Sequence, residues 1–370
     1  MIRLAFRNLF QNKVRLTISI GGVALALLLI LSLDAVFTGV ERQITAYIDY
    51  SGADVWVSQE DVFNMHMASS SLPDSVARKV KNVPGVASVT PIMYLTNNVI
   101  AGDERNLAYI IGLPERPAFG GPWKISAGRK LPGNGEVIID RNIAEKSGLA
   151  LGENVEILGE DFEVTGFSEG SASLVSSVAF ISMDDFEKMR GNYGTISFLL
   201  VKVLEGESPE VVAARIQNQV RDVTVQSRSA FATQERKVVK DMSTDVITMM
   251  NLIGFMIGLA VMALTVYTST LSRRREYGML KALGARNKDL YGTVLAQAIL
   301  SVILGLLFGL ALTLLLTILV PILGANLLLE ISLISLLKVS SVSLVIAAIS
   351  AMLPVRQIAG LDPAMVFRGK

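Results

Sequence analysis

The 370-residue sequence contains no cysteine and a single histidine, His66. The absence of cysteine excludes disulfides, iron–sulfur clusters and cysteine-based zinc sites, and one histidine excludes any metal site that needs two histidine ligands. Charged residues are also scarce at 18%, whereas about a quarter is usual in a soluble domain. With 51% hydrophobic residues and a mean hydropathy of +0.49, the chain is too apolar to be soluble throughout.

Motifs of common hydrolases and nucleotide-binding enzymes are absent as well. The sequence has no GxxxxGK[ST], GxSxG or HExxH, so it has no P-loop, nucleophile elbow or metalloprotease motif of its own. The long apolar runs also lack the mid-span ionisable residue that pumps and proton-coupled carriers use, since Lys338 lies near the end of its run. We therefore expect a non-catalytic membrane subunit that binds no cofactor or metal and takes its energy from elsewhere.

The charges that are present divide sharply along the chain. Residues 41–245 carry 20 Lys and Arg against 28 Asp and Glu, a net charge of −8, and the remainder carries 14 against 5, a net of +9. A nucleic-acid-binding protein would instead concentrate positive charge on one soluble face, so this class is disfavoured.

Four uncharged or nearly uncharged runs predict transmembrane helices, because a helix of about 20 apolar residues crosses the hydrocarbon core. They lie at residues 16–37, 246–271, 290–320 and 331–354, with a short outer loop at 321–330. The segments 1–15, 272–289 and 355–370 are rich in Lys and Arg, so the positive-inside rule places them, and both termini, in the cytoplasm. The chain is predicted to be a multi-pass protein of the cell (inner or cytoplasmic) membrane.

Residues 38–245 then form an extracytoplasmic domain. Short helical patterns, such as 141–147 and 183–190, alternate with β-branched runs bounded by turn residues, such as 136–140 and 178–182. This mixture predicts an α+β domain with its own core. The flanking stretches 37–50 and 231–244 have charged helical character, which predicts that the first two membrane helices continue outward as a stalk.

The cytoplasmic loop 272–289 contains a short amphipathic pattern. Tyr277, Leu280 and Leu283 fall near one face of a helix with basic edges, and Gly284 is placed to end that helix. Two interpretations remain open from the residues alone. The loop either only sets the topology, or it forms a short helix that docks into a groove on a cytoplasmic partner.

Motifs along the whole chain resemble the FtsX-like, MacB-type ABC transporter permeases. The segment Arg275-Glu-Tyr-Gly-x-x-Lys281-Ala-Leu-Gly-Ala285 is similar to the R-E-[IY]-G-x-x-[KR]-A-[LI]-G-A signature of that family. Pro354-Val-Arg356, Leu361-Asp-Pro-Ala364 and Phe367-Arg368 resemble its closing pattern, and Leu4-Ala-Phe-Arg-Asn-Leu9 its amphipathic N-terminal segment. Gly128-Arg129, Glu136-Val-Ile-Ile-Asp140 and Gly148-Leu-x-Leu-Gly152-Glu153 resemble its periplasmic core domain.

The resemblance implies a fold of four transmembrane helices plus an extracytoplasmic α+β domain of MacB periplasmic-core type. It also implies a homodimer in the lipid membrane that assembles with two copies of a separate ABC ATP-binding subunit, which would bind ATP and Mg. ATP-driven closure of those subunits would be transmitted through the helices to the outer domains. A periplasmic adaptor would join where an outer membrane is present.

The same resemblance marks the loop as the element that couples to the ATPase. The residues assigned to this coupling are Arg274, Arg275, Glu276, Tyr277, Gly278, Lys281, Ala282, Leu283 and Gly284.

Three functional classes remain open. The favoured one is an ATP-driven exporter or extractor of a lipid, lipoprotein, peptide or small hydrophobic compound, with haem among the candidates. The second is an FtsX-like signalling permease that regulates a cell-wall hydrolase through its outer domain, and the third is a membrane adaptor without an ATPase.

Two further groups of residues are candidates for contacts. The small-residue pairs Gly254/Gly258 and Gly305/Gly309 are spaced for close helix approach and are predicted dimer contacts. The candidate substrate contacts are Met65, His66, Met67, Met249 and Met250, since Met and His are soft ligands found on haem iron. The alternatives for the 64–68 segment are an apolar loop that packs on the outer domain or touches lipid, and a contact with another amphiphile.

Overall fold

The computed structural model describes residues 13–171, 177–191, 193–323 and 327–359. The chain divides into two compact units, a helical unit (Met1–Gly39 and Ser243–Lys370) and a sheet unit (Val40–Met242). The bounds of the sheet unit differ by only a few residues from those predicted for the extracytoplasmic domain. The predicted N-terminal segment up to residue 12, Gly324 in the predicted loop, and the closing pattern from residue 360 onward lie outside the described residues.

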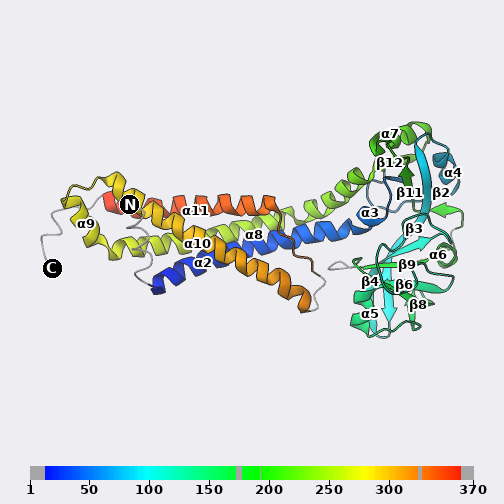
Figure 1. The fold of residues 1–370 in the computed structure, drawn as a ribbon, viewed down its shortest axis with the longest axis horizontal. Coiled ribbons are helices and arrows are strands. Elements are labelled where there is room, and N and C mark those ends of the chain that lie inside the picture. The colour runs from blue at the N-terminus through cyan, green and yellow to red at the C-terminus, as the bar shows by residue number, and fades with distance from the viewer. Residues whose placement is uncertain (1–12, 172–176, 192, 324–326, 360–370) are drawn as a thin grey trace. The chain divides into compact units, whose positions relative to one another are not determined.

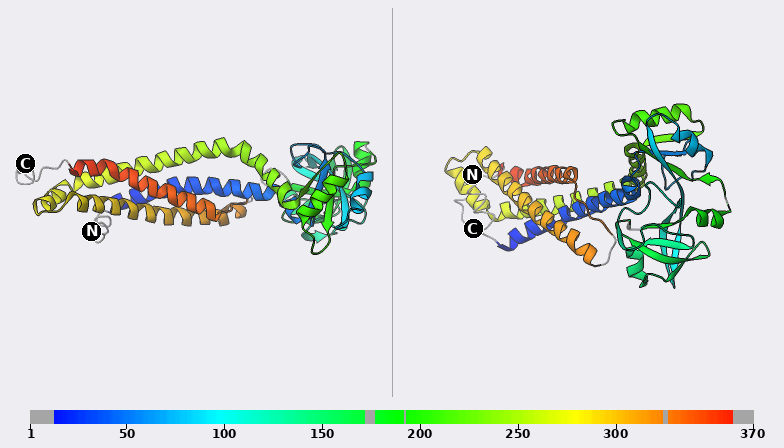
Figure 2. Two further views of the ribbon diagram at one scale, coloured as in Figure 1. Left: turned by 90° about the horizontal axis from the view of Figure 1, so that it is seen from above. Right: turned by 45° about the vertical axis from the view of Figure 1, so that its right-hand side comes forward.

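Four long helices make up the helical unit and run alongside one another (Figures 1 and 2). They are α2 (Lys13–Ile44), α8 (Arg228–Ser272), α10 (Asn287–Ile322) and α11 (Leu333–Ala359). Among the described residues, each of the four is long and apolar enough to cross a membrane, at Leu16–Ile44, Arg228–Ser272, Asn287–Val320 and Leu333–Gln357. The prediction of four transmembrane helices is therefore confirmed.

Helix α11 does not end at Pro354, where the last span was predicted to stop, but continues to Ala359. A proline inside a helix removes one backbone hydrogen bond and is costly. Here Pro354 is buried, and Ala351 and Val355 on either side of it belong to or pack against the buried helix cluster. Side-chain burial therefore carries the helix through the proline.

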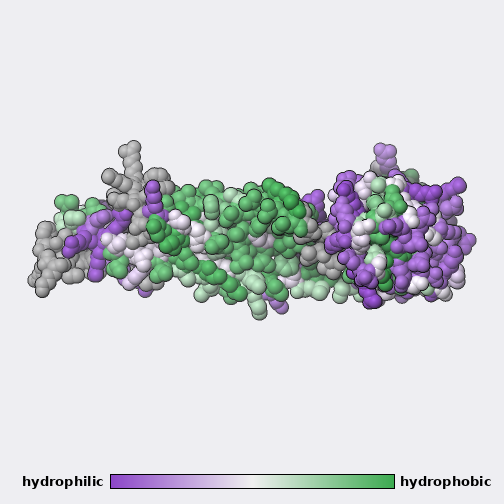
Figure 3. All heavy atoms as spheres, turned by 90° about the horizontal axis from the view of Figure 1, so that it is seen from below, coloured by the Kyte–Doolittle hydropathy of each residue, from purple (hydrophilic) through white to green (hydrophobic). Residues whose placement is uncertain are grey.

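The helical unit has an apolar exterior as well as an apolar core. In Figure 3 its surface is a broad hydrophobic band, whereas the sheet unit presents mainly hydrophilic residues. Polar contacts inside the bundle are few but specific, such as the 2.9 Å hydrogen bond that the Gln297 side-chain amide donates to Ser269 Oγ, from α10 to α8. Such a bond stabilises helix pairing in lipid, where water does not compete for the donor.

All four glycines predicted at a dimer contact face other residues of the same chain. A Cβ atom built at Gly305 would lie 2.7 Å from Val23 Cγ1, and one at Gly309 would lie 3.0 Å from the Ala24 carbonyl oxygen. Gly254 likewise faces α2, at Ile30, and Gly258 faces both α2 and α11. The close approach at these glycines is therefore made within one chain, and the predicted dimer contact at them stays a prediction.

Replacing Gly305 by isoleucine should destabilise the helical unit, since Val23 is fully buried and has no space to move into. Overpacking of this kind costs about 1–3 kcal/mol. We expect a lower midpoint of thermal unfolding for the full chain in detergent.

Gly292→Ile is the matched control, because Gly292 is on the same helix and nothing lies within 4 Å of a Cβ built there. Equal midpoints for the two variants would contradict the intrachain contact.

The sheet unit is built on one ten-stranded mixed sheet with the order β12-β1-β11-β3-β4-β9-β6-β8-β5, in which β7 pairs with both β3 and β8. The strands are β1 (Val55–Gln59), β3 (Val86–Ala101), β4 (Glu104–Leu113), β5 (Ile125–Gly128), β6 (Glu136–Asp140), β7 (Asn154–Ile157), β8 (Glu160–Ser168), β9 (Ser177–Ser182), β11 (Phe198–Val203) and β12 (Val223–Ser227). A separate two-stranded sheet joins β2 (Leu72–Pro73) to β10 (Thr195–Ile196). The α+β prediction is thus confirmed.

Strand β3 belongs to both halves of the unit. Its first part pairs with β11, and its second part pairs with β4 and β7. Because β7 also pairs with β8, the ladder β3-β4-β9-β6-β8-β7 closes on itself as a barrel around a buried apolar cluster. The open half, β12-β1-β11, packs its apolar side chains with those of α4 (Ser75–Lys81) and α7 (Pro209–Gln219).

Two short helices follow barrel strands, and each begins at a side-chain cap. The Asp140 carboxylate accepts the Asn142 N–H at the start of α5 (Arg141–Ser147). Ser182 Oγ accepts the Asp185 N–H at the start of α6 (Met183–Arg190). Such caps satisfy amide groups that a helix leaves unpaired in its first turn, and α6 is thereby positioned to present its last residue, Arg190.

Between the halves lies an aromatic cluster that also contacts the beginning of α8. Trp56 of β1 stacks on Phe231 of α8 with ring centroids 4.8 Å apart. Tyr47 of α3 (Ala46–Tyr50) meets Trp56 edge-on and donates its hydroxyl to the Gly120 carbonyl at 2.8 Å. The two chain segments that enter and leave the sheet unit are therefore fixed to its core.

Candidate functional site

Two parts of the structure are candidate functional sites: the short helix α9 in the helical unit and a polar pocket in the sheet unit. Helix α9 (Arg274–Ala282) forms where the loop pattern predicted a helix. It ends in a Schellman motif, in which the Ala285 N–H bonds the Leu280 carbonyl at 2.9 Å and the Gly284 N–H bonds the Lys281 carbonyl at 3.0 Å. Gly284 has φ +92°, a conformation that glycine adopts without steric cost, as its predicted role requires.

The face of α9 that points inward is set by Tyr277. This side chain is only 2% exposed and belongs to the same buried cluster as Leu290 and Val294 of α10. Burial raises the pKa of Tyr277 above its ordinary value, so its ring and neutral hydroxyl anchor α9 on the bundle. Leu280 packs against the same cluster.

The face that points outward differs from the predicted one. Leu283 is 85% exposed and Met279 is 49% exposed, and Arg275 stands one turn before Met279. These three are spaced i, i+4 and i+8, so they form one stripe. The predicted Tyr277–Leu280–Leu283 stripe is therefore wrong except for Leu283, and Tyr277 is an internal anchor, not a surface contact.

The remaining residues assigned to coupling lie around this outward stripe. Arg274, Glu276, Ala282 and Gly284 are exposed, Lys281 is half-buried and Gly278 is buried. The Glu276 carboxylate pairs with Arg273 at 3.2 Å across one turn. Met279 was not singled out from the sequence, although its spacing of four from Leu283 is a signal that could have identified it.

Truncating Tyr277 to alanine should release α9 from the bundle, since loss of a buried aromatic ring costs about 3–5 kcal/mol. We expect a lower midpoint of thermal unfolding for Tyr277→Ala and a smaller effect for Tyr277→Phe.

Leu283→Ala is the surface control and should leave the midpoint unchanged. The reverse ranking, with Leu283→Ala the more damaging, would show that α9 is oriented differently.

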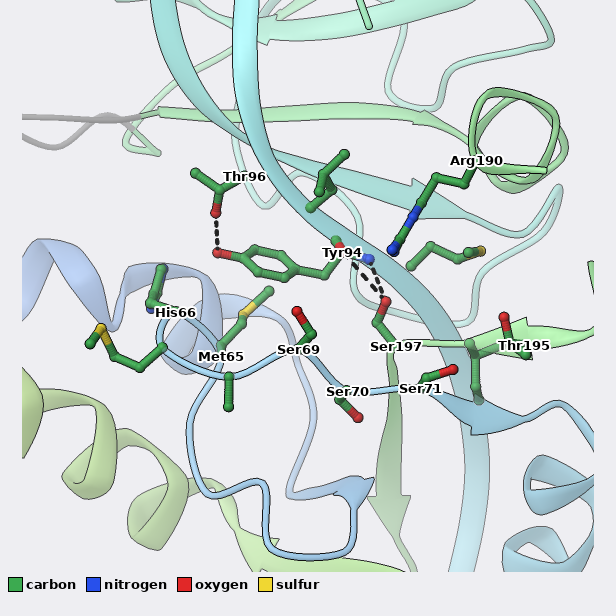
Figure 4. A pocket seen from close by; sticks show the side chains of 15 residues that line it. Met65, His66, Ser69, Ser70, Ser71, Tyr94, Thr96, Arg190, Thr195 and Ser197 are labelled. Carbon is green, nitrogen blue, oxygen red and sulfur yellow. Dashed lines mark hydrogen bonds between the residues drawn. The ribbon is translucent and has the colours of Figure 1, made fainter. Parts of the chain in front are cut away.

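The pocket in the sheet unit is formed around the loop 60–71, which connects β1 to β2. Three sets of bonds hold this loop. The Ser58 hydroxyl donates to the Val62 carbonyl, Asn64 Oδ1 accepts the Met67 N–H, and the Gln59 backbone and side chain bond Ser70 and Ser71. The loop therefore has a defined path beside β3 (Figure 4).

A fully buried carboxylate on α8 fixes the middle of that loop. Glu235 is 0% exposed, and its Oε1 lies 2.5 Å from His66 Nδ1 while its Oε2 accepts the Met65 N–H at 2.7 Å. The His66 ring also packs against Tyr109, with centroids 4.3 Å apart. The only histidine of the chain is thus the partner of a buried acid.

Polar groups from β3, β10 and α6 complete the pocket. Ser197 Oγ accepts the Tyr94 N–H at 2.9 Å, at the point where the chain passes from β10 to β11. The Tyr94 hydroxyl is bonded to Thr96 Oγ1 at 2.9 Å, and burial raises the pKa of Tyr94 well above its usual range. Figure 4 shows Arg190 reaching from the end of α6 toward Tyr94 and Ser197.

The predicted substrate contacts are placed unequally. Met65, His66 and Met67 all line the pocket, but Met65 is 2% exposed and belongs to the aromatic cluster. Met249 and Met250 are exposed on α8 in the helical unit. The described residues contain no group of three or more potential metal ligands, and the packed alternative accounts for Met65 and His66.

Removing the Glu235 carboxylate should free the loop 60–71, because the half-buried His66 ring and the Met65 amide would lose their partner. Leaving a buried donor without its acceptor costs about 1–3 kcal/mol. For Glu235→Ala in the full chain we expect faster hydrogen exchange at residues 62–68, together with a lower unfolding midpoint.

Gln234→Ala, one position earlier and exposed, should change neither quantity. Unchanged exchange in Glu235→Ala would exclude the carboxylate as the anchor of the loop.

Comparisons with known proteins match both the segment that contains the sheet unit and the segment of the last three membrane helices. A family model for the MacB-like periplasmic core domain matches residues 16–219, and one for the FtsX-like permease C-terminal matches residues 248–363. An uncharacterized ABC transporter permease of Methanocaldococcus jannaschii is 24% identical over 330 residues, which cover 80% of this chain and 78% of that protein. Another from Mycobacterium bovis is 21% identical over 371 residues, with both chains covered completely.

Among solved structures, the periplasmic region of MacB from Actinobacillus actinomycetemcomitans aligns with a TM-score of 0.39 and 15% identity, over 50% of this chain and 93% of that one. The family matches, the four membrane helices and the inserted sheet unit define the class of ABC transporter permeases. Within that class, the chain belongs to the MacB-like and FtsX-like family.

Proposed function

We propose that this permease transmits ATP-driven movement of separate ATP-binding subunits, docked on α9, to the sheet unit on the other side of the membrane. The observation that carries the proposal is the continuity of α8. It begins directly after β12 and ends at Ser272, one residue before the cap of α9, without a break. At 1.5 Å per residue, its 45 residues span about 68 Å.

The surface of α9 suits a docking helix. Its outward stripe, Arg275, Met279 and Leu283, offers two exposed apolar side chains at helical spacing with a cation beside them. Amphipathic helices bind partner grooves through such spacing. Arg274, Arg286 and Lys288 add exposed positive charge on and just after α9. By the positive-inside rule this charge supports a position of α9 on the cytoplasmic side of the cell membrane. Since four helices cross the membrane, both termini would then lie on the same side.

The anchor contacts at both ends of α8 support the same proposal. Phe231 and Glu235 bind one end to the core of the sheet unit, and Tyr277 ties the helix that follows the other end to the bundle. In the proposal, a displacement of α9 is therefore passed along α8 to the side chains that pack at its other end. In the proposed complex the permease is a homodimer with two ATP-binding subunits.

The transported compound is proposed to be a lipid, lipoprotein, peptide or small hydrophobic molecule. Haem loses support among these, because Met65 is buried and His66 Nδ1 is bonded to Glu235. An FtsX-like signalling role would use the same transmission with a hydrolase as the receiver.

The test uses the absence of native cysteine, which allows one spin label per chain at Asp103→Cys, an exposed turn position of the sheet unit. The permease is purified with its ATP-binding subunit in nanodiscs, and the distance between labels on the two copies is measured with and without ATP. We expect a shift on ATP binding that Asp241→Pro abolishes, because proline breaks α8 at a cost of about 3 kcal/mol.

Asp241→Ala is the matched control, since it keeps the helix and should keep the shift. Both variants should still retain the ATP-binding subunit. A shift that survives Asp241→Pro, or the absence of any shift in the parent complex, would contradict transmission along α8.

A further inference from the structure

The pocket in the sheet unit has the size of a small-ligand site. Its cavity has a volume of about 280 Å³, enough for about nine water molecules at ~30 Å³ each. A dipeptide or a monosaccharide fits such a volume. The walls come from the loop 60–71, β3, the end of α6 and β10, so the cavity is formed by segments that the fold already holds in place.

Hydroxyl groups dominate the polar part of this wall. Ser69, Ser71, Thr96 and Thr195 contribute theirs from exposed or half-buried positions, and the Tyr94 hydroxyl adds another. A hydroxyl both donates and accepts, so the wall can bind amide, hydroxyl or carboxylate groups. Met93 and Ile196 supply a smaller apolar section.

The charge of the wall has one sign. The described lining residues include Arg190 and His66 but no Asp or Glu, and the Nδ1 of His66 is already bonded to Glu235. Within the described part of the chain, no ion pair occupies the guanidinium of Arg190. A cation that points toward the hydroxyl groups of a cavity whose described lining contains no carboxylate favours an anionic ligand.

We propose that this cavity binds the carboxylate of a small organic acid, with Arg190 as the cationic partner and the hydroxyl groups binding the rest of the ligand. A guanidinium presents two parallel N–H donors that match the two oxygens of a carboxylate. A phosphate dianion carries two charges, but Arg190 is the only Lys or Arg among the described residues of this wall, so the wall matches the single charge of a carboxylate better. The carboxylate belongs to the C-terminus of a short peptide or to a sugar acid, and the two share this recognition.

This site goes beyond the proposed transmission and does not depend on it. Binding needs only the sheet unit to be folded, whereas transmission needs α8 and α9. Failure of one proposal therefore leaves the other standing.

The test measures binding to the full chain in nanodiscs by saturation-transfer NMR and equilibrium dialysis. The probes are N-acetyl-Ala-Ala and its C-terminal amide, and glucuronate and glucose. We expect at least one acid to bind about tenfold or more tightly than its uncharged counterpart, the size of a lost charge-assisted bond. The acid that binds identifies the source of the carboxylate.

Arg190→Met should lower the affinity for that acid about tenfold and leave the affinity for its uncharged counterpart unchanged. Arg78→Met, at an exposed arginine of α4 away from the cavity, should bind as the parent does. Ser71→Trp should fill the cavity and remove binding. Equal affinity for acid and uncharged probe, no binding of either acid, or undiminished binding to Arg190→Met would overturn the proposal.

Discussion

The structure depends on one constraint, that a single uninterrupted helix serves three environments in turn. The first part of α8 packs in the core of the sheet unit, its middle is apolar enough to cross a bilayer, and its end leads directly into α9. A helix satisfies its own backbone hydrogen bonds, so it can pass from water to lipid without exposing unpaired groups. A loop inside the bilayer would leave backbone groups unpaired.

Glu235 fixes the first part of α8 to the sheet unit through its buried carboxylate. A buried carboxylate is costly unless all of its oxygens are bonded, and here both are, by His66 and the Met65 amide. The loop that supplies these donors is also one wall of the polar pocket. The same few bonds therefore hold both a wall of the pocket and the first part of α8.

Much of the fold could be predicted from the sequence. Continuous apolar runs identified four membrane helices. The bounds of α5 and α6 could be predicted to the residue, because Asp140 and Ser182 cap their first turns and Gly148 and Gly191 end them. The short strands β2, β5 and β12 were missed. Their pairing partners, not their own composition, make them strands, and β12 pairs with β1 across more than 160 residues of sequence.

The candidate sites could be predicted less well, for a related reason. Helical spacing showed that α9 is amphipathic, but only packing against Leu290 and Val294 decides that Tyr277 points inward and Met279 outward. The glycine pairs indicated close approach without identifying the neighbour, which is α2 and, at Gly258, also α11. The sequence did not distinguish Glu235 from the other acids of a charged helix, because its bonding partner His66 lies 169 residues earlier in the chain.

The pairing of β1 has a consequence for how the protein is made. Both edges of β1 are covered by strands from the far end of the sheet unit, β11 and β12. During synthesis, β1 follows the first membrane helix, but β11 is complete only at residue 203 and β12 only at residue 227. An unpaired apolar strand is prone to aggregation, so the nascent chain needs protection throughout this interval. Completion of the sheet then coincides with the emergence of α8, and the second membrane insertion begins from a domain that has just closed.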